Sequence, residues 1–419
     1  MKQFEKIKSK TLFALCLKVS SALVSFFSVV VITRYLGIEQ SGYYFLAYSI
    51  ISILAVVSRV GLDNTVLRFT GAAVSEKNYP SIRGLMNKSM GLALLGSSFI
   101  GLLGYISVPT LATEVFKQPE LINVLKFSMP AIVAISLSTL IGMFFQGIGH
   151  IAKTVFLVNI AINLLLIIFL VIFNSSTAKD AAVFLSLSSL LTLFIGLFFC
   201  IPYTKYPILY DLEWKTLASS FIPLWVMMTM QQVIQWSGRI IAGAWLPATD
   251  VALLAVAQRT ALLTSFILMA VNLVIAPSFA ALYKKNDMEN LKESAIKAMK
   301  LTAFFGLFLS APLFLFPQFF LGIFGDEFAS GGKLLRIMVV GQIINVITGP
   351  VLMLLSMTGN ERYLKSAIIY SAFISVFSGL VLVPTYGVQG AAIATAIAVS
   401  TQNILLLMQV NKALGFRIF

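Results

Sequence analysis

Basic side chains inside long apolar segments are the residues of this sequence best suited to binding chemistry. Lys18, Arg59, Arg239 and Arg259 each lie among residues that prefer lipid. A charge at the centre of a bilayer costs at least about 2.5–3.5 kcal/mol, so such residues face a protein interior or a watery cavity. Guanidinium groups also match the geometry of phosphate oxygens. The four cations therefore predict a site that binds an anion.

Two glutamines extend this pattern along one face of a helix. Gln231 and Gln235 precede Arg239 at four-residue spacing, which aligns two amides with a guanidinium. Such a polar stripe is poorly suited to lipid, so we assign both glutamines to the same substrate-binding site. Arg259 has a polar neighbour of its own, Gln258.

Asp63 is the one acid that lies well inside an apolar segment, in the stretch VVSRVGLDNTVLRF. It follows Arg59 by four residues, so the two side chains share a helix face. One interpretation is a structural salt bridge, and the other is that Arg59 binds the anion while Asp63 holds and tunes it. Asp63 is also the first candidate for coupling transport to an ion gradient.

Other ionisable residues allow less specific interpretations. Lys126 and Arg336 lie near the ends of apolar segments, where they could either serve the site or extend to lipid headgroups. His150, the one histidine, fits a surface or packing position. The sequence has no phosphate-binding loop, metal-ligand cluster or Ser–His–Asp set, so we expect no catalytic residue, metal site or cofactor.

The elements that must position these residues are membrane-spanning helices. Of the 419 residues, 59% are hydrophobic and 11% are charged, and the mean hydropathy is +0.94; soluble proteins carry about 25% charged residues. The apolar runs are continuous over about 20 residues rather than alternating, which favours helices over a barrel. Twelve spans are predicted near 11–33, 42–66, 86–108, 121–145, 151–173, 180–202, 217–245, 250–280, 298–322, 333–357, 363–384 and 388–410.

The distribution of Lys and Arg predicts how these spans are oriented. Basic residues concentrate at the two ends of the chain and in the loops after even-numbered spans. The loops after odd-numbered spans hold only Arg34, Lys117, Lys179 and Lys333. Because cytoplasmic loops collect Lys and Arg, both termini are predicted to be cytoplasmic. This rule also accounts for much of the net charge of +14. No nucleic-acid motif accompanies it, so nucleic acid is not an expected partner.

An internal repeat divides the chain into halves. With a shift of 210 residues, Gly149 aligns with Gly359 and Met143 with Met353, and the twelve spans align as six pairs. Both halves then start on the same side of the membrane, which predicts two pseudo-symmetric six-helix bundles, 1–210 and 211–419, around a central cavity. None of the four cations has a charged counterpart under this shift, so the repeat alone does not account for them.

Several stretches of the sequence resemble a known family of transporters. They are TRYLGIEQSGYYFLAYSI after span one, VSRVGLDNTVLRF closing span two, FFQGIGH and LLSMTGN after spans four and ten, and LVPTYGVQGAAIATAIA before span twelve. Their order and spacing resemble the Wzx-type oligosaccharidyl-lipid (O-antigen) flippases of the multidrug/oligosaccharidyl-lipid/polysaccharide exporter superfamily. The resemblance implies a basic central cavity formed by Lys18, Arg59, Arg239 and Arg259.

The resemblance also implies a substrate and a direction of transport. The substrate would be undecaprenyl pyrophosphate bearing a short glycan such as an O-antigen repeat unit. It would move from the cytoplasmic to the periplasmic leaflet of the bacterial inner membrane. Further candidate partners are a polysaccharide polymerase and a chain-length regulator. The outward movement of an anion is favoured by a cell that is negative inside.

Two other functions fit a chain of this type less well. A drug exporter of the same superfamily would favour acids rather than cations in its cleft. A membrane polysaccharide polymerase or ligase has a similar number of spans. The resemblance among such enzymes includes a large outward loop that carries catalytic residues. All predicted outward loops here are short.

Overall fold

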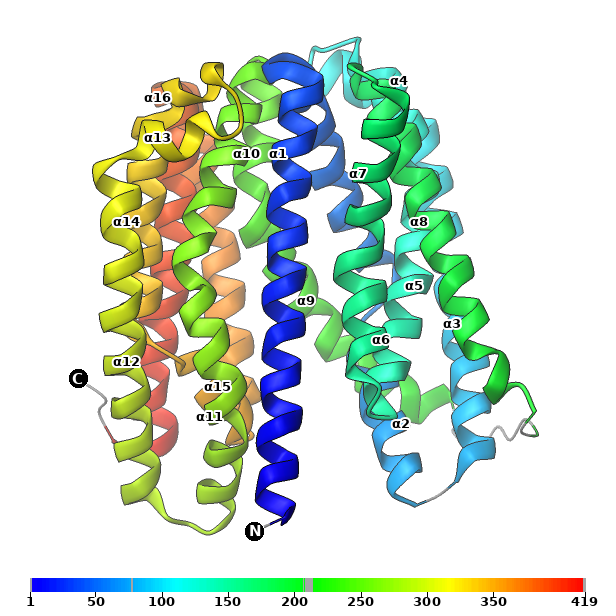
Figure 1. Ribbon diagram of the computed structural model, residues 1–419, viewed down its shortest axis with the longest axis vertical. Helices are drawn as coiled ribbons and strands as arrows, with labels where there is room; N and C mark the ends of the chain where they lie inside the picture. Colours follow the sequence, from blue (N-terminus) through cyan, green and yellow to red (C-terminus); the bar gives the residue numbers. More distant parts are fainter. Residues whose placement is uncertain (1, 77, 206, 208–213, 417–419) are drawn as a thin grey trace. The chain divides into compact units, whose positions relative to one another are not determined.

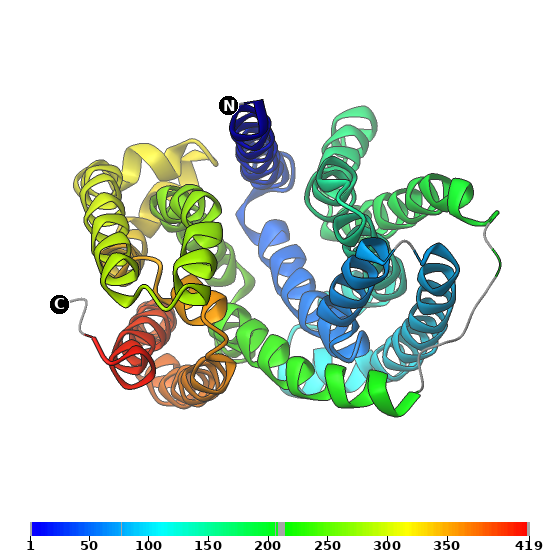
Figure 2. The same cartoon turned by 90° about the horizontal axis from the view of Figure 1, so that it is seen from below.

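A computed structural model describes residues 2–76, 78–205, 207 and 214–416 of this chain (Figure 1). Helices make up nearly all of these residues, and the described ranges contain no strand. The chain divides into two compact units. Unit 2 is Cys16–Gln232, and unit 1 combines Met1–Leu15 with Val233–Phe419. Figure 2 shows the helices of each unit end-on, from the end at which the chain begins.

Most of the first half of the chain belongs to unit 2, and its elements are helices of very different lengths. They are α1 (Lys2–Ser58), α2 (Leu62–Ser75), α3 (Tyr79–Thr110), η1 (Leu111–Val115), α4 (Leu121–Ser128), α5 (Pro130–Gly147), α6 (Ile151–Val155), η2 (Phe156–Ile160), α7 (Ala161–Phe173), α8 (Ala178–Cys200) and η3 (Ile201–Tyr203). The first residues of α1 belong to unit 1.

The remaining elements follow a helix that contributes to both units. This helix is α9 (Trp214–Trp245), and the division between the units falls within it, after Gln232. The elements of unit 1 are then α10 (Ala248–Ala261), η4 (Leu262–Ser265), α11 (Phe266–Lys284), α12 (Met288–Leu315), α13 (Pro317–Gly322), η5 (Asp326–Gly331), α14 (Gly332–Thr348), α15 (Val351–Met357) and α16 (Glu361–Leu414). The predicted boundary between residues 210 and 211 lies outside the described residues and stays a prediction.

The predicted spans correspond to these helices. Nine helical segments of the described chain are long and apolar enough to cross a membrane. Two of them, in α1 and α16, bend sharply and supply two predicted spans each. Helix α9, whose first residues follow an undescribed segment, matches the seventh predicted span. The all-helical, membrane-spanning fold predicted from the sequence is therefore confirmed.

The bends in α1 and α16 both depend on a glycine. Gly37 has φ 72° and ψ 179°, and Gly387 has φ 58° and ψ −141°. Side chains exclude this part of backbone space almost completely, so only glycine adopts it at low cost. Each glycine thus reverses the chain between two consecutive spans with almost no loop.

The predicted repeat is visible in the local backbone of the two units. Helix α5 ends at Gly147 and α6 begins at Ile151, while α15 ends at Met357 and α16 begins at Glu361. Within these turns, Gly149 and Gly359 both have positive φ, 85° and 71°. The same turn therefore recurs after 210 residues, as the sequence repeat predicts.

Each unit has its own apolar core. In unit 2, α5 lies at the centre and packs against α2, α3 and α8, with Phe144 and Phe145 almost completely buried. In unit 1, α14 packs against α10, α12 and α16, and Phe279 and Phe328 are buried. The outward faces of the surrounding helices are rich in exposed Leu, Ile and Phe, as expected for surfaces that contact lipid.

Candidate functional site

The second predicted span is broken at its arginine. Helix α1 ends at Ser58 and α2 begins at Leu62, and between them Val60 and Gly61 have φ 50° and 77°. The sequence predicted one continuous span over 42–66, and the structure corrects this. A left-handed conformation is easy for Gly61 but costly for β-branched Val60, so neighbouring contacts must hold the break in place.

Arg59 and Asp63 join the two sides of this break. Arg59 Nε donates to Asp63 Oδ1 at 2.7 Å, and the two residues are only 6% and 5% exposed. Arg59 follows the carboxyl end of α1, and Asp63 lies in the first turn of α2. Each charge therefore complements the dipole of the helix end beside it. The salt bridge predicted from the four-residue spacing is present, and it spans two helix ends rather than one helical turn.

The carbonyl oxygen of Ala55 accepts three hydrogen bonds at the break. Because α1 stops after one further turn, this oxygen accepts from side chains: Arg59 Nη1 at 2.9 Å, Ser58 Oγ at 3.0 Å and Ser136 Oγ at 3.2 Å. Ser136 lies on α5, and its hydroxyl is also 2.9 Å from that of Ser58. The break is thus fixed to the central helix of unit 2.

A second carbonyl at the break is satisfied by a more distant residue. The indole Nε1 of Trp225, on the part of α9 that belongs to unit 2, donates to the Val57 carbonyl at 3.0 Å. The same carbonyl also accepts from the Val60 N–H at 3.2 Å, so the indole adds a second donor where the break removes the usual helical one. Trp225 and Ser136 had not been assigned a role from the sequence, because neither spacing nor hydropathy relates them to Arg59.

Arg59 keeps part of its hydrogen-bonding capacity. Its bonds to Asp63 and Ala55 use two of the five N–H groups of the guanidinium. The other three have no partner among the described residues. A buried arginine that is oriented by two bonds and still offers donors has the properties needed to bind an anion.

In unit 1, Arg239 contacts the amide of Gln258 and the ring of Trp236. Its Nε donates to Gln258 Oε1 at 3.0 Å, and its guanidinium carbon lies 4.7 Å from the centre of the Trp236 ring. Gln258 in turn donates from Nε2 to the Gln235 carbonyl at 3.1 Å, which ties α10 to α9. Arg239 and Gln258 are 8% and 9% exposed. These contacts orient the guanidinium without neutralising its charge.

The other predicted site residues are more accessible. Lys18, Arg259 and Gln231 are half-buried, and the side chain of Gln235 is exposed. Lys18 and Gln231 belong to unit 2, while Arg259 and Gln235 belong to unit 1. The structure brings Arg59 together with Asp63, and Arg239 with Gln258. That all four cations share one cavity stays a prediction.

Lys126 and Arg336 lie at more superficial positions. Lys126 is half-buried, with its ammonium 5.9 Å from the centre of the Tyr105 ring. Arg336 is exposed, and its Nε donates to the Phe314 carbonyl at 3.0 Å. Both arrangements fit side chains that extend along the protein surface toward a polar boundary.

A polar cluster in unit 1 was missed in the sequence. Ser265 Oγ donates to Gln342 Oε1 at 2.6 Å, and Asn345 Nδ2 donates to both Ser265 Oγ and Gln342 Oε1 at 3.1 Å. The cluster links α14 to η4, where the helix of span eight tightens into a 3₁₀ turn. Two amides three residues apart in an apolar span were the signal that could have revealed it.

Comparison with families and solved structures agrees with this architecture. The family of polysaccharide biosynthesis proteins matches residues 7–283, and the MatE family matches residues 223–385. No curated protein matches the chain in sequence. The family match that covers most of the chain starts just before the first predicted span and ends just after the eighth.

Solved structures with a similar fold are distant from this chain in sequence. The chain is similar to a lipid II flippase, MurJ, with a TM-score of 0.78 and 17% identity over 96% of this chain and 87% of that one. It is similar to an inward-facing multidrug resistance MATE transporter, with a TM-score of 0.74 and 14% identity over 96% and 98%. It is also similar to a transporter of this superfamily from Pyrococcus furiosus, with a TM-score of 0.65 and 14% identity over 97% of this chain and 95% of that one.

These structures share a fold of twelve helices in two lobes, which matches the helices of this chain. A chain of this fold and family is a transporter rather than an enzyme, which excludes the polymerase or ligase alternative. The chain belongs to the polysaccharide biosynthesis protein family, and its fold is that of solved transporters of the multidrug/oligosaccharidyl-lipid/polysaccharide superfamily.

Proposed function

We propose that this transporter is a flippase for an oligosaccharide linked to undecaprenyl pyrophosphate, such as an O-antigen repeat unit or a similar unit of a surface polysaccharide. It moves this lipid from the cytoplasmic to the periplasmic leaflet of the bacterial inner membrane, with both termini in the cytoplasm. The family match supports a role in polysaccharide biosynthesis, and the similar fold of a lipid II flippase supports a lipid-linked substrate.

The observation that carries this proposal is the pair of buried, oriented guanidinium groups, one in each unit. Arg59 and Arg239 are both less than a tenth exposed. Arg59 is oriented by two hydrogen bonds, and Arg239 by one hydrogen bond and the ring of Trp236. A buried cation is expensive in a membrane protein unless it serves a function or is fully compensated. A pyrophosphate offers the oxygen pairs that such planar forks bind best.

The remaining predicted residues complete this site in the proposal. Lys18 and Arg259 add positive charge, and Gln231 and Gln235 provide amides that can bind phosphate or sugar hydroxyls. The two halves, 1–210 and 211–419, form the six-helix bundles that alternate the access of the site between the two leaflets. The membrane potential favours outward movement of the anion by about 2.3 kcal/mol per charge per 100 mV.

Asp63 is the proposed coupling residue. It is buried and bonded to Arg59, so a change in its charge changes the electrostatic state of the guanidinium directly. A cation that neutralises Asp63 would release Arg59 to bind the substrate more fully, and the departure of that cation would restore the ion pair. A polysaccharide polymerase and a chain-length regulator are proposed to act on the flipped lipid.

A drug exporter of the same superfamily is the second candidate function. The MatE match and the similar fold of multidrug transporters favour it. The cationic residues of the site argue against it. They suit an anion, whereas a cationic drug would need an acidic cleft. The two candidate functions differ in the ligand of Arg239. A flippase would bind a lipid-linked glycan there, and a drug exporter would bind a small molecule.

The test is to purify the protein, reconstitute it in vesicles and measure translocation of an undecaprenyl-pyrophosphate-linked oligosaccharide. We expect Arg239→Ala to reduce translocation at least tenfold and Arg239→Lys to restore part of it, since charge returns without the bidentate fork. Arg336→Ala is the matched control, because it removes an exposed arginine of the same unit. Full activity of Arg239→Ala, or absence of transport by the intact protein, would refute the proposal.

A further inference from the structure

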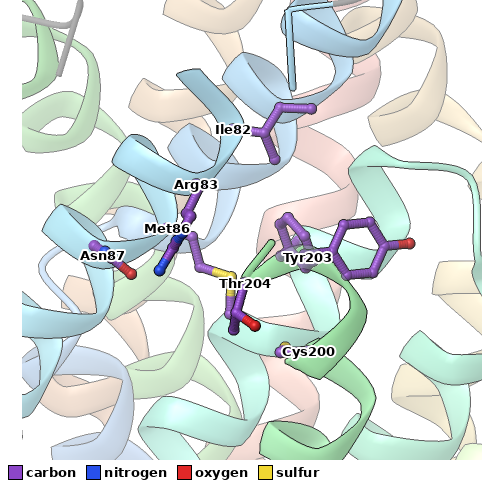
Figure 3. Close-up of a pocket in the computed structure, with 8 residues that line it drawn as sticks. Ile82, Arg83, Met86, Asn87, Cys200, Tyr203 and Thr204 are labelled. Atoms are coloured by element: carbon purple, nitrogen blue, oxygen red, sulfur yellow. The ribbon is translucent and has the colours of Figure 1, made fainter. Parts of the chain in front are cut away.

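A small cavity lies inside unit 2, where the first turns of α3 meet the end of α8 and η3 (Figure 3). It has a volume of about 90 Å³. One water needs about 10–15 Å³, so the cavity can hold several waters or one tetrahedral anion. The residues that line it are Ile82, Arg83, Met86, Asn87, Phe144, Cys200, Tyr203 and Thr204.

The lining divides into an apolar part and a polar part. Ile82 and Phe144 are buried and belong to the core of unit 2. Arg83, Asn87 and Thr204 are half-buried or exposed and carry a guanidinium, an amide and a hydroxyl. In Figure 3, Arg83 and Asn87 extend from α3 on one side of the cavity, and Thr204 lies on the opposite side. These are the donor groups that bind a phosphate oxygen.

The surroundings of the cavity are positively charged. Lys205 directly follows Thr204, and Lys88 lies one residue beyond Asn87. Lys153 lies 4.8 Å and 5.0 Å from the ring centres of two phenylalanines at the same end of unit 2, Phe145 and Phe199. The sequence of α3 contains no acid. An anion that approaches the cavity therefore meets a favourable potential.

The helix face that carries Asn87 continues as an apolar stripe. Leu94, Leu95 and Leu102 follow Asn87 at helical spacing and are 46%, 71% and 60% exposed. Large apolar side chains this exposed on a membrane helix contact hydrocarbon. A ligand with a phosphate in the cavity could therefore extend its chains along α3 without leaving an apolar surface.

We propose that this cavity binds the phosphodiester headgroup of an anionic phospholipid from the leaflet at this end of unit 2, with the acyl chains along Leu94 and Leu95. Arg83 and Asn87 bind the phosphate oxygens, and Thr204 closes the site from the opposite side. The site uses none of the residues proposed to bind the transported lipid, and it does not depend on the identity of that substrate. Its ligand is a lipid of the bilayer itself.

The thiol of Cys200 provides a local readout, because it lines the cavity. In a Cys16→Ser background Cys200 is the one cysteine. The purified protein is placed in nanodiscs of phosphatidylcholine with or without phosphatidylglycerol, and the rate of labelling by N-ethylmaleimide is measured. We expect phosphatidylglycerol to slow labelling several-fold in the otherwise unchanged protein. Equal rates in the two lipids would overturn the proposal.

Two variants then assign the effect to the cavity. Arg83→Gln should weaken protection by phosphatidylglycerol about fivefold, the contribution expected of one basic residue near an anionic surface. Lys292→Gln removes an exposed cation from unit 1 and should leave protection unchanged. Equal loss in both variants would show a general effect of charge and contradict the site. Equal protection by millimolar inorganic phosphate in pure phosphatidylcholine would identify a free anion, and would reject the lipid.

Discussion

At the scale of single residues, Arg59 has a structural role and a proposed binding role, which the sequence presented as alternatives. Its bonds to Asp63 and to the Ala55 carbonyl stabilise a broken span, and its remaining donors are available to an anion. The four-residue spacing was enough to predict the ion pair. The spacing could not reveal the bond to the Ala55 carbonyl. This carbonyl lacks its helical partner only because the helix breaks, and hydropathy predicts a continuous helix there.

Substitution of Arg59 and Asp63 separates the two purposes. Arg59→Leu or Asp63→Leu alone strands a buried charge and should destabilise the protein by about 3–5 kcal/mol. The double leucine variant should recover expression and much of the unfolding temperature, but it should not transport, because the anion loses its guanidinium. Fluorescence-detected gel filtration and the vesicle assay measure the two effects. Wild-type transport by the double variant would assign the pair a purely structural role.

At the scale of elements, the sequence was informative about where helices lie and poor about where they break. Hydropathy sums the transfer free energy of about 20 residues, so it locates spans well. It is insensitive to one or two residues with unusual φ, and Val60 in particular favours extended or helical backbone. Gln258 was visible as a polar neighbour of Arg259, but its bond to Arg239 depends on how α9 and α10 pack.

The glycine at the bend of α1 allows a direct test of backbone strain. A Cβ at Gly37 would meet no atom within 4 Å, so Gly37→Ala changes only the conformational preference of the residue. We expect a loss of stability of about 1–3 kcal/mol, seen as a lower unfolding temperature in detergent. Gly91→Ala in α3 is the control, since Gly91 has equally open surroundings and no positive φ. It should not destabilise the protein, and an equal loss in both variants would argue against strain.

At the scale of the whole molecule, the repeat predicts two equivalent halves and the charge distribution predicts an orientation. Both are patterns over the whole chain, so they can be recognised in a sequence that does not reveal individual contacts. The recurrence of one turn at Gly149 and Gly359 supports the repeat. A common cavity for Lys18, Arg59, Arg239 and Arg259 depends on the placement of two units, and no pattern in a single sequence specifies that placement.

The orientation of the whole chain is tested by single cysteines in a Cys16→Ser, Cys200→Ser background. Cysteines at Glu120 and Glu327, both exposed, should react with an impermeant thiol reagent added outside the cell. Cysteines at Glu76 and Glu289 should react only after the membrane is permeabilised, because their loops are rich in Lys and Arg. Reaction at Glu289 in intact cells would invert the proposed topology.

The ion pair at the break also bears on how the chain enters the membrane during synthesis. Arg59 and Asp63 are four residues apart, so they leave the ribosome almost together and reach the translocon as one unit. Either charge alone would add about 2.5–3.5 kcal/mol to the insertion of this segment. Paired, they enter as a dipole of no net charge, and we expect Asp63→Asn to lower the inserted fraction of the isolated segment in a glycosylation-based insertion assay. Biosynthesis would then select for the pair independently of transport.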